Sequence, residues 1–221
     1  MSAIFAPFGL YPVLHPSGIL RQSVSGQTGV FQGGGPGGGN SIASGYANNI
    51  FQYSPVQIDS QTPSGNVILA PAQGAAGATA AANKIIGAFE GVEFTLTATG
   101  RRTVANFWAA STVATNIVAW ITRDAMIIYE IQANASVPAT ALGGQLSIST
   151  NGSANGNTTT GFSSVAADFN VVSGTSFTQT TTNQLRIVGF SQRVDNAPGD
   201  AFTILQVQIS GHQDTAQVAA Y

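Results

Sequence analysis

Hydrophobic residues recur along this chain in short runs separated by turn-forming residues. Few segments show the 3.6-residue periodicity of an amphipathic helix. Residues 84–98 contain the clearest alternation, because apolar positions there repeat every second residue. One face of this segment carries Val92, Phe94 and Leu96, and the other carries Phe89, Gly91 and Glu93. Successive side chains of a β-strand point to opposite faces of its sheet, so the alternation predicts a strand with two distinct faces.

Two pairs of such runs predict β-hairpins. Residues 116–122 and 126–133 flank the sequence RDA, and residues 185–194 and 201–211 flank DNAPGD. Shorter strand candidates precede them at 41–53, 55–58 and 66–70. Short, evenly spaced strands with turns between them favour an all-β fold, which is either jelly-roll-like or another β-barrel or sandwich.

The first 40 residues differ from the rest of the chain. The segment FAPFGLYPVLHPSG at 5–18 is apolar and uncharged, and its prolines favour an extended backbone over a helix. The tract GGGPGGGN at 33–40 has the composition of a flexible linker. We therefore predict an extended N-terminal arm with a Gly-rich linker over residues 1–40. A single β-barrel domain is predicted over residues 41–221.

Charge is sparse, at 7% of residues, while 43% are hydrophobic and the formal net charge is −2. A nucleic-acid groove needs clustered Lys and Arg to neutralise phosphates, so we expect no nucleic-acid partner. The chain has one lysine, Lys84, whereas monomeric sheets protect their edges with Lys, other charges and Pro. The sheet edges are therefore expected to be closed into a barrel or covered by neighbouring subunits.

No apolar run reaches the roughly 18 residues that a membrane span requires. The nearest candidate, at 67–89, is interrupted by residues that include Pro71, Asn83 and Lys84. The first residues also lack the basic region of a secretory signal. We expect a water-soluble protein that is made inside the cell and has no membrane partner.

Few residues suggest catalysis or metal binding. The chain has no cysteine and two histidines, His15 and His212, and it lacks a G-x-S-x-G motif. Neither a thiolate centre nor a Ser–His–acid triad is therefore indicated. Asp195 and Asp200 share one turn, where calcium binding is an alternative to the favoured interpretation, the capping of backbone N–H groups. We expect no catalytic residues, no metal and no cofactor.

Two further pairs of charged residues lie close together in the sequence. Glu90 and Glu93 lie three apart on the predicted strand, hence on opposite faces, and cannot form a glycosidase pair with each other. Arg101 and Arg102 are the only adjacent cations. They indicate either a solvated turn or a contact with a carboxylate of a neighbouring subunit.

The order of motifs along the chain resembles a known family. The sequence FGLYPVLHPSG at 8–18 leads into SIASGYANNIFQYSPVQI at 41–58, and TGRRTVANFWAAST follows at 99–112. The chain then continues to RIVGFSQRVDNAPGDAFTILQVQISGHQ at 186–213. This set is similar to tailed-bacteriophage virion proteins described as head decoration, or cement, proteins. The resemblance implies a bacteriophage structural protein without enzymatic activity, made in the bacterial cytoplasm and located on the outer surface of the virion capsid.

The resemblance also implies partners, namely the phage major capsid protein and other copies of the chain in a homotrimer, with capsid stabilisation as the result. The apolar arm would bury side chains on a capsid subunit or on a neighbouring copy. The alternative is that the segment folds back onto its own domain as a covering strand. The predicted contact residues are Phe5, Phe8, Leu10, Tyr11, Pro12, Val13, Leu14, His15, Pro16, Arg21, Arg101 and Arg102.

Other functions share some of these features. A head-fibre or receptor-binding virion protein would have the same all-β, Gly-rich and oligomeric character. A polysaccharide-degrading enzyme would need converging acids, for which Glu90, Glu93 and Asp124 are the residues to test. A cytosolic barrel that binds a small molecule would leave the apolar arm without a partner.

Overall fold

The computed structural model describes the chain in segments. They are residues 4–17, 29–31, 42–59, 66–71, 84–149, 156–169, 184–213 and Thr215, with the backbone alone for 29–31. Within them the fold is all-β, as predicted, with twelve strands and one short 3-10 turn at Ala139–Ala141. No helix in the described segments is long and apolar enough to cross a membrane.

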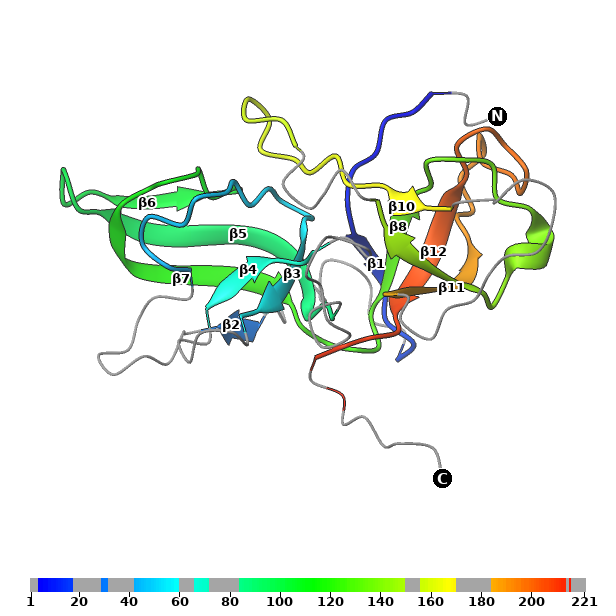
Figure 1. The fold of residues 1–221 in the computed structure, drawn as a ribbon, viewed down its shortest axis with the longest axis horizontal. Helices are drawn as coiled ribbons and strands as arrows, with labels where there is room; N and C mark the ends of the chain where they lie inside the picture. Colours follow the sequence, from blue (N-terminus) through cyan, green and yellow to red (C-terminus); the bar gives the residue numbers. More distant parts are fainter. Residues whose placement is uncertain are drawn as a thin grey trace.

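The strands form two antiparallel sheets, which lie side by side along the long axis of the molecule (Figure 1). The first, called the β8 sheet, has the order β1-β8-β12-β11-β9-β10. Its strands are β1 (Tyr11–Leu14), β8 (Ile128–Gln132), β12 (Ile204–Ile209), β11 (Leu185–Phe190), β9 (Gln145–Ile148) and β10 (Ala167–Asp168).

The second sheet, called the β5 sheet, has the order β2-β7-β5-β3-β4, and β6 also pairs with β5. Its strands are β2 (Gly29–Phe31), β7 (Ala114–Thr122), β5 (Gly87–Leu96), β3 (Pro55–Ile58), β4 (Val67–Leu69) and β6 (Arg102–Ala105). The two sheets pack separate cores. Tyr129, Ile131, Leu185 and Val207 belong to the core of the β8 sheet, whereas Phe89, Ile117 and Trp108 belong to that of the β5 sheet. The single β-barrel domain expected over residues 41–221 stays a prediction.

One of the two predicted hairpins is confirmed and the other is wrong. β11 and β12 pair antiparallel around the DNAPGD turn, with Leu185 opposite Ile209. β7 and β8, in contrast, belong to different sheets: β7 pairs with β5, and β8 pairs with β12 and β1. The RDA sequence therefore carries the chain from one sheet to the other instead of folding it back on itself.

The predicted faces of β5 also need a correction at Phe89. The pairing of β5 with β7 shifts between Phe89 and Gly91, so Glu90 is an extra residue with no partner position on β7. Such a bulge reverses the alternation on one side of the insertion. Phe89 and Val92 are consequently both buried in the same core, although the sequence pattern placed them on opposite faces.

The described part of the predicted arm lies on the rest of the chain. β1 pairs antiparallel with β8, and Tyr11 lies opposite Glu130. Residues 4–17 thus follow the alternative of a covering strand, and an extended arm is not confirmed. The predicted contact residue Arg21 and the Gly-rich linker at 33–40 lie outside the described residues.

Candidate interaction surface

A single glutamine fixes the start of the described chain. Gln132 ends β8, and its side chain donates to the carbonyl of Ile4 (2.9 Å) and accepts from the N–H of Ala6 (2.7 Å). One amide thereby satisfies a backbone donor and a backbone acceptor, as a neighbouring strand would. Phe5, between them, packs its ring 5.2 Å from that of Phe202 and keeps 49% of its surface exposed.

A charged cluster lies next to this segment. Glu130, on β8, is 7% exposed, and its carboxylate accepts from the Ser191 hydroxyl at 2.6 Å. Its other oxygen accepts from Nη2 of Arg193 at 2.7 Å and from Nε at 3.2 Å. The Arg193 guanidinium also lies 5.3 Å from the centre of the Phe8 ring, within cation–π range. The cluster therefore joins β8, the β11–β12 loop and the N-terminal segment.

Aromatic rings continue from Phe8 toward the β5 sheet. Phe8 contacts Tyr11 (6.2 Å between centroids), Tyr11 contacts Tyr53 (5.1 Å), and Tyr53 stacks on Phe162 (5.9 Å). Tyr53 has a positive φ of 68°. Its N–H donates to the carbonyl of Phe89 at 2.6 Å, which helps to hold this costly conformation. Phe162, at the end of the row, is 44% exposed.

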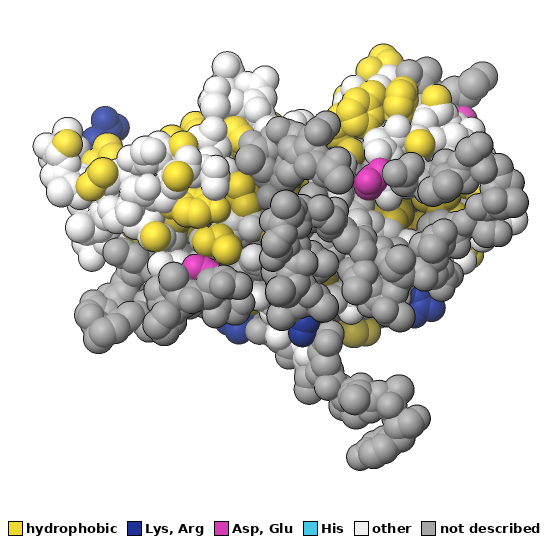
Figure 2. All heavy atoms as spheres, viewed as in Figure 1, with side chains coloured by type: hydrophobic (Ala, Val, Ile, Leu, Met, Phe, Trp, Pro, Cys, Tyr) yellow, Lys and Arg dark blue, Asp and Glu magenta, His cyan; other side chains and the backbone are white. Residues whose placement is uncertain are grey.

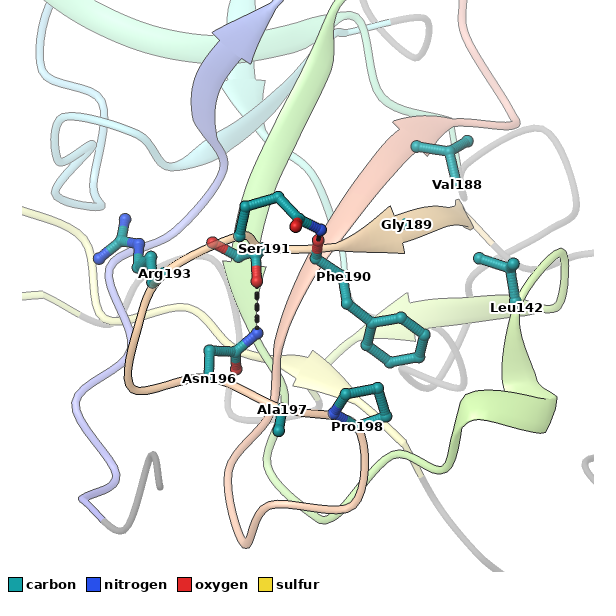
Figure 3. Close-up of a pocket in the computed structure, with 10 residues that line it drawn as sticks. Leu142, Val188, Gly189, Phe190, Ser191, Arg193, Asn196, Ala197 and Pro198 are labelled. Atoms are coloured by element: carbon teal, nitrogen blue, oxygen red, sulfur yellow. Dashed lines mark hydrogen bonds between the residues drawn. The ribbon is translucent and has the colours of Figure 1, made fainter.

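A groove opens beside the same cluster. It encloses about 460 Å³ and is called the β11 groove here. The Phe190 ring lies beside Pro198 among the residues that line it (Figure 3). The lining residues are Leu142, Val188, Gly189, Phe190, Ser191, Gln192, Arg193, Asn196, Ala197 and Pro198.

The main polar groups of the β11 groove are engaged within the chain. Asn196 donates to the carbonyls of Ser191 and Ile204, both at 3.0 Å, and Arg193 binds Glu130. Asp200 accepts from the N–H of Ala197 at 2.8 Å, which confirms the predicted turn cap for this aspartate. The groove consequently offers mainly apolar contacts, from Leu142 (56% exposed), Val188 (38% exposed) and Phe190.

The candidate catalytic and metal-binding residues do not converge. The described part of the chain contains no group of three or more His, Asp or Glu side chains that could hold a metal ion. His15 lies 3.3 Å from a carboxylate oxygen of Asp124, and Nδ1 of the same ring contacts the Ser17 hydroxyl at 2.6 Å. His212 is 1% exposed, and its backbone forms an isolated parallel β-bridge with Ile85. These contacts position the start of the chain and the end of β12.

The predicted contact residues fall into three groups. Leu10 and Pro12 are buried, which leaves their side chains no surface for another molecule. Phe8, Tyr11, Val13 and His15 are half-buried. The exposed members are Phe5, Leu14, Pro16, Arg101 and Arg102.

Arg102 already has a carboxylate partner in its own chain, because its Nε donates to Glu93 across the β5–β6 ladder. This hydrogen bond lowers the pKa of Glu93 below its ordinary value and raises that of Arg102. The Arg102 side chain is exposed and that of Glu93 is partly exposed, so salt screens the attraction between them.

Sequence reasoning missed most of the exposed apolar surface. Figure 2 shows hydrophobic side chains in patches at both ends of the visible face, with few charged groups among them. In the described segments, the exposed large apolar residues outside the predicted set are Ile4, Val104, Val113, Met126, Leu142, Phe162, Val188 and Val194. Sequence reasoning also missed Glu130, although a lone carboxylate inside the apolar run IYEIQ was a usable signal.

Comparisons with protein-family models, with curated protein sequences and with solved structures found no match to this chain.

Proposed function

We propose that this chain is a structural protein of a tailed-bacteriophage virion, which binds the outer surface of the capsid and stabilises it. The proposal includes an oligomer of the chain, a trimer in the family that the sequence resembles, and contact with the major capsid protein. The proposal is motivated by the order of motifs along the chain, which begins with FGLYPVLHPSG at 8–18 and ends with the C-terminal hairpin. This order resembles that of head decoration proteins.

One structural observation carries the proposal. The described surface exposes large apolar side chains, and those of Leu142 and Val188 gather at the β11 groove. A protein that must attach to many identical subunits needs such contacts and needs no catalytic group. Apolar contacts also persist when salt changes, because ionic screening weakens charged contacts and leaves apolar ones in place.

The expected strength of attachment suits a repeated lattice. Fully burying side chains of the size of Leu142, Val188 and Phe190 stabilises a complex by about 1.5–3 kcal/mol each, before the costs of association are subtracted. A single contact of this size is weak. Several copies joined in one oligomer would attach to the capsid at the same time. The affinity of the oligomer for the capsid would then exceed the affinity of a single copy.

Quantitative mass spectrometry of purified virions tests the proposal. The chain is counted against the major capsid protein, and a copy number near a simple ratio to the capsid subunit is the expected result. A copy number far below the capsid subunit would identify a head-fibre or receptor-binding component instead. Absence from the virion would overturn the proposal.

A further inference from the structure

Strand β6 forms an open edge of the β5 sheet. Among the described strands it pairs only with β5, with Glu93 opposite Val104 and Thr95 opposite Arg102. Figure 1 places β6 along the outer margin of its sheet. The N–H of Leu96 donates to the carbonyl of Arg101. In an antiparallel ladder every second residue hydrogen-bonds to the same neighbour, so the N–H and C=O groups of residues 101, 103 and 105 face β5. The backbone groups of Arg102 and Val104 therefore turn outward.

This edge is weakly protected, because its one charged residue, Arg102, is paired with Glu93 of the neighbouring strand. Its sequence RTVA contains no Lys and no Pro, and Val104 is 64% exposed. Two other edge strands are better protected against pairing with another strand. β1 contains Pro12, and on β4 the N–H of Leu69 donates to the Tyr46 hydroxyl at 3.2 Å. No described residue occupies the outward backbone groups of Arg102 and Val104. The β6 edge is thus a template for another strand.

We propose that the β6 edge pairs antiparallel with the β6 edge of a second copy, about a two-fold axis at Thr103. Arg102 and Val104 of one copy would then exchange backbone hydrogen bonds with Val104 and Arg102 of the other. Thr103 would lie opposite Thr103 of the second copy, as a non-hydrogen-bonded pair with Cα atoms about 4.5 Å apart. The two β5 sheets would become one continuous sheet.

Charge favours this register over the one centred on Arg102. Glu93 lies opposite Val104 in its own ladder, so the second copy's Arg102 would stand two strands away in the same row. Two strand spacings are about 10 Å, a span that the long side chains of Arg and Glu can bridge. Each Glu93 would then stand between two arginines. A shift that centred the pair on Arg102 would instead place two guanidinium groups opposite each other, which is unfavourable.

The inference does not rest on the proposed function, since edge pairing needs no capsid. A two-fold contact is also distinct from the three-fold contact of a trimer, because a two-fold operator joins copies in pairs. In a shell of trimers the β6 edges would link one trimer to the next.

The absence of cysteine from the chain permits a direct test. The variant Thr103→Cys, in the full chain, is oxidised in air and separated by non-reducing electrophoresis. The expected Cα separation suits a disulfide between copies. Thr140→Cys is the matched control, because Thr140 is an exposed threonine on the β8 sheet side. We expect Thr103→Cys to form covalent pairs at least about tenfold faster than the control, since pairing raises the local thiol concentration.

A second variant tests whether edge pairing is the cause. Val104→Pro removes an outward N–H and leaves the ladder with β5 intact, because edge strands accept proline at such positions. The double variant Thr103→Cys, Val104→Pro should lose the fast cross-link while keeping its circular-dichroism spectrum and melting temperature. Cross-linking of Thr103→Cys at the rate of Thr140→Cys, or equally fast cross-linking in the double variant, would overturn the inference.

Discussion

Leu10 donates its backbone N–H to the carbonyl of Tyr53 at 2.8 Å, and its side chain is completely buried. The neighbouring N–H of Gly9 donates to Val165 at 3.0 Å. Gly9 has a φ of +78°, and a Cβ there would lie 2.3 Å from the Tyr53 carbonyl oxygen, so only glycine fits this crossing. The N-terminal segment is therefore built into the fold where β1 passes the start of β3.

The first prediction concerns this segment. Leu10→Ala should lower the free energy of unfolding by about 2–5 kcal/mol, because it leaves a cavity in the core of the β8 sheet. Leu14→Ala is the matched control in the same segment, since Leu14 is 37% exposed and should change stability by less than about 1 kcal/mol. Urea denaturation measures both. Equal effects would mean that the segment does not pack at Leu10 in solution.

The second prediction concerns Glu130. Glu130→Gln should destabilise the protein by about 1–3 kcal/mol, because the Arg193 guanidinium and the Ser191 hydroxyl lose a charged acceptor. Glu93→Gln is the control, since it removes a carboxylate from the surface ion pair with Arg102 and should destabilise the protein less than Glu130→Gln does. A Glu130→Gln variant as stable as the Glu93→Gln variant would contradict the role assigned to the cluster.

The third prediction is a dependence on alkaline pH. Burial raises the pKa of Tyr129 above its ordinary value of 10, and its hydroxyl donates to the Thr122 carbonyl at 3.1 Å. Above pH 10 the Tyr129 phenol ionises in the unfolded state while it stays neutral in the folded state. The contribution of Tyr129 to the free energy of unfolding is therefore complete below pH 10 and is lost as the pH rises above it. The loss from Tyr129 should approach about 1.4 kcal/mol per pH unit.

Denaturation of the wild type and of Tyr129→Phe below and above pH 10 separates this group from the other tyrosines. The variant cannot ionise at this position, so its stability should decline less steeply with pH. Parallel declines in the two proteins would show that Tyr129 ionises as freely in the folded state as in the unfolded state.

The fourth prediction concerns the β11 groove. The double variant Leu142→Ser, Val188→Ser should reduce attachment to purified capsids by about tenfold or more, because two exposed apolar contacts are lost. Val113→Ser is the control, since Val113 is similarly exposed (59%) but does not line the groove. Attachment is measured by co-sedimentation with capsids that lack the chain. Equal binding by both variants would exclude the groove as the contact.

Much of the site was beyond the reach of sequence reasoning. Phe5 was predicted to be a contact residue, and it is half exposed beside Phe202. The pairing of Glu130 with Arg193 joins residues 63 positions apart, and no local pattern reports it. The apolar residues that line the β11 groove come from two loops and from strand β11, so their convergence depends on the fold.

The sequence by itself determined the all-β class and the β11–β12 hairpin, because both follow from local properties: a period of two and the turn chemistry of DNAPGD. Only the tertiary structure decided that β7 and β8 join different sheets, although RDA looks like a hairpin turn. It also decided that Glu90 bulges and that Leu10 is buried on its own chain. The physical reason is that the partner of each strand is chosen by burial of apolar surface against segments distant in sequence, which local periodicity does not encode.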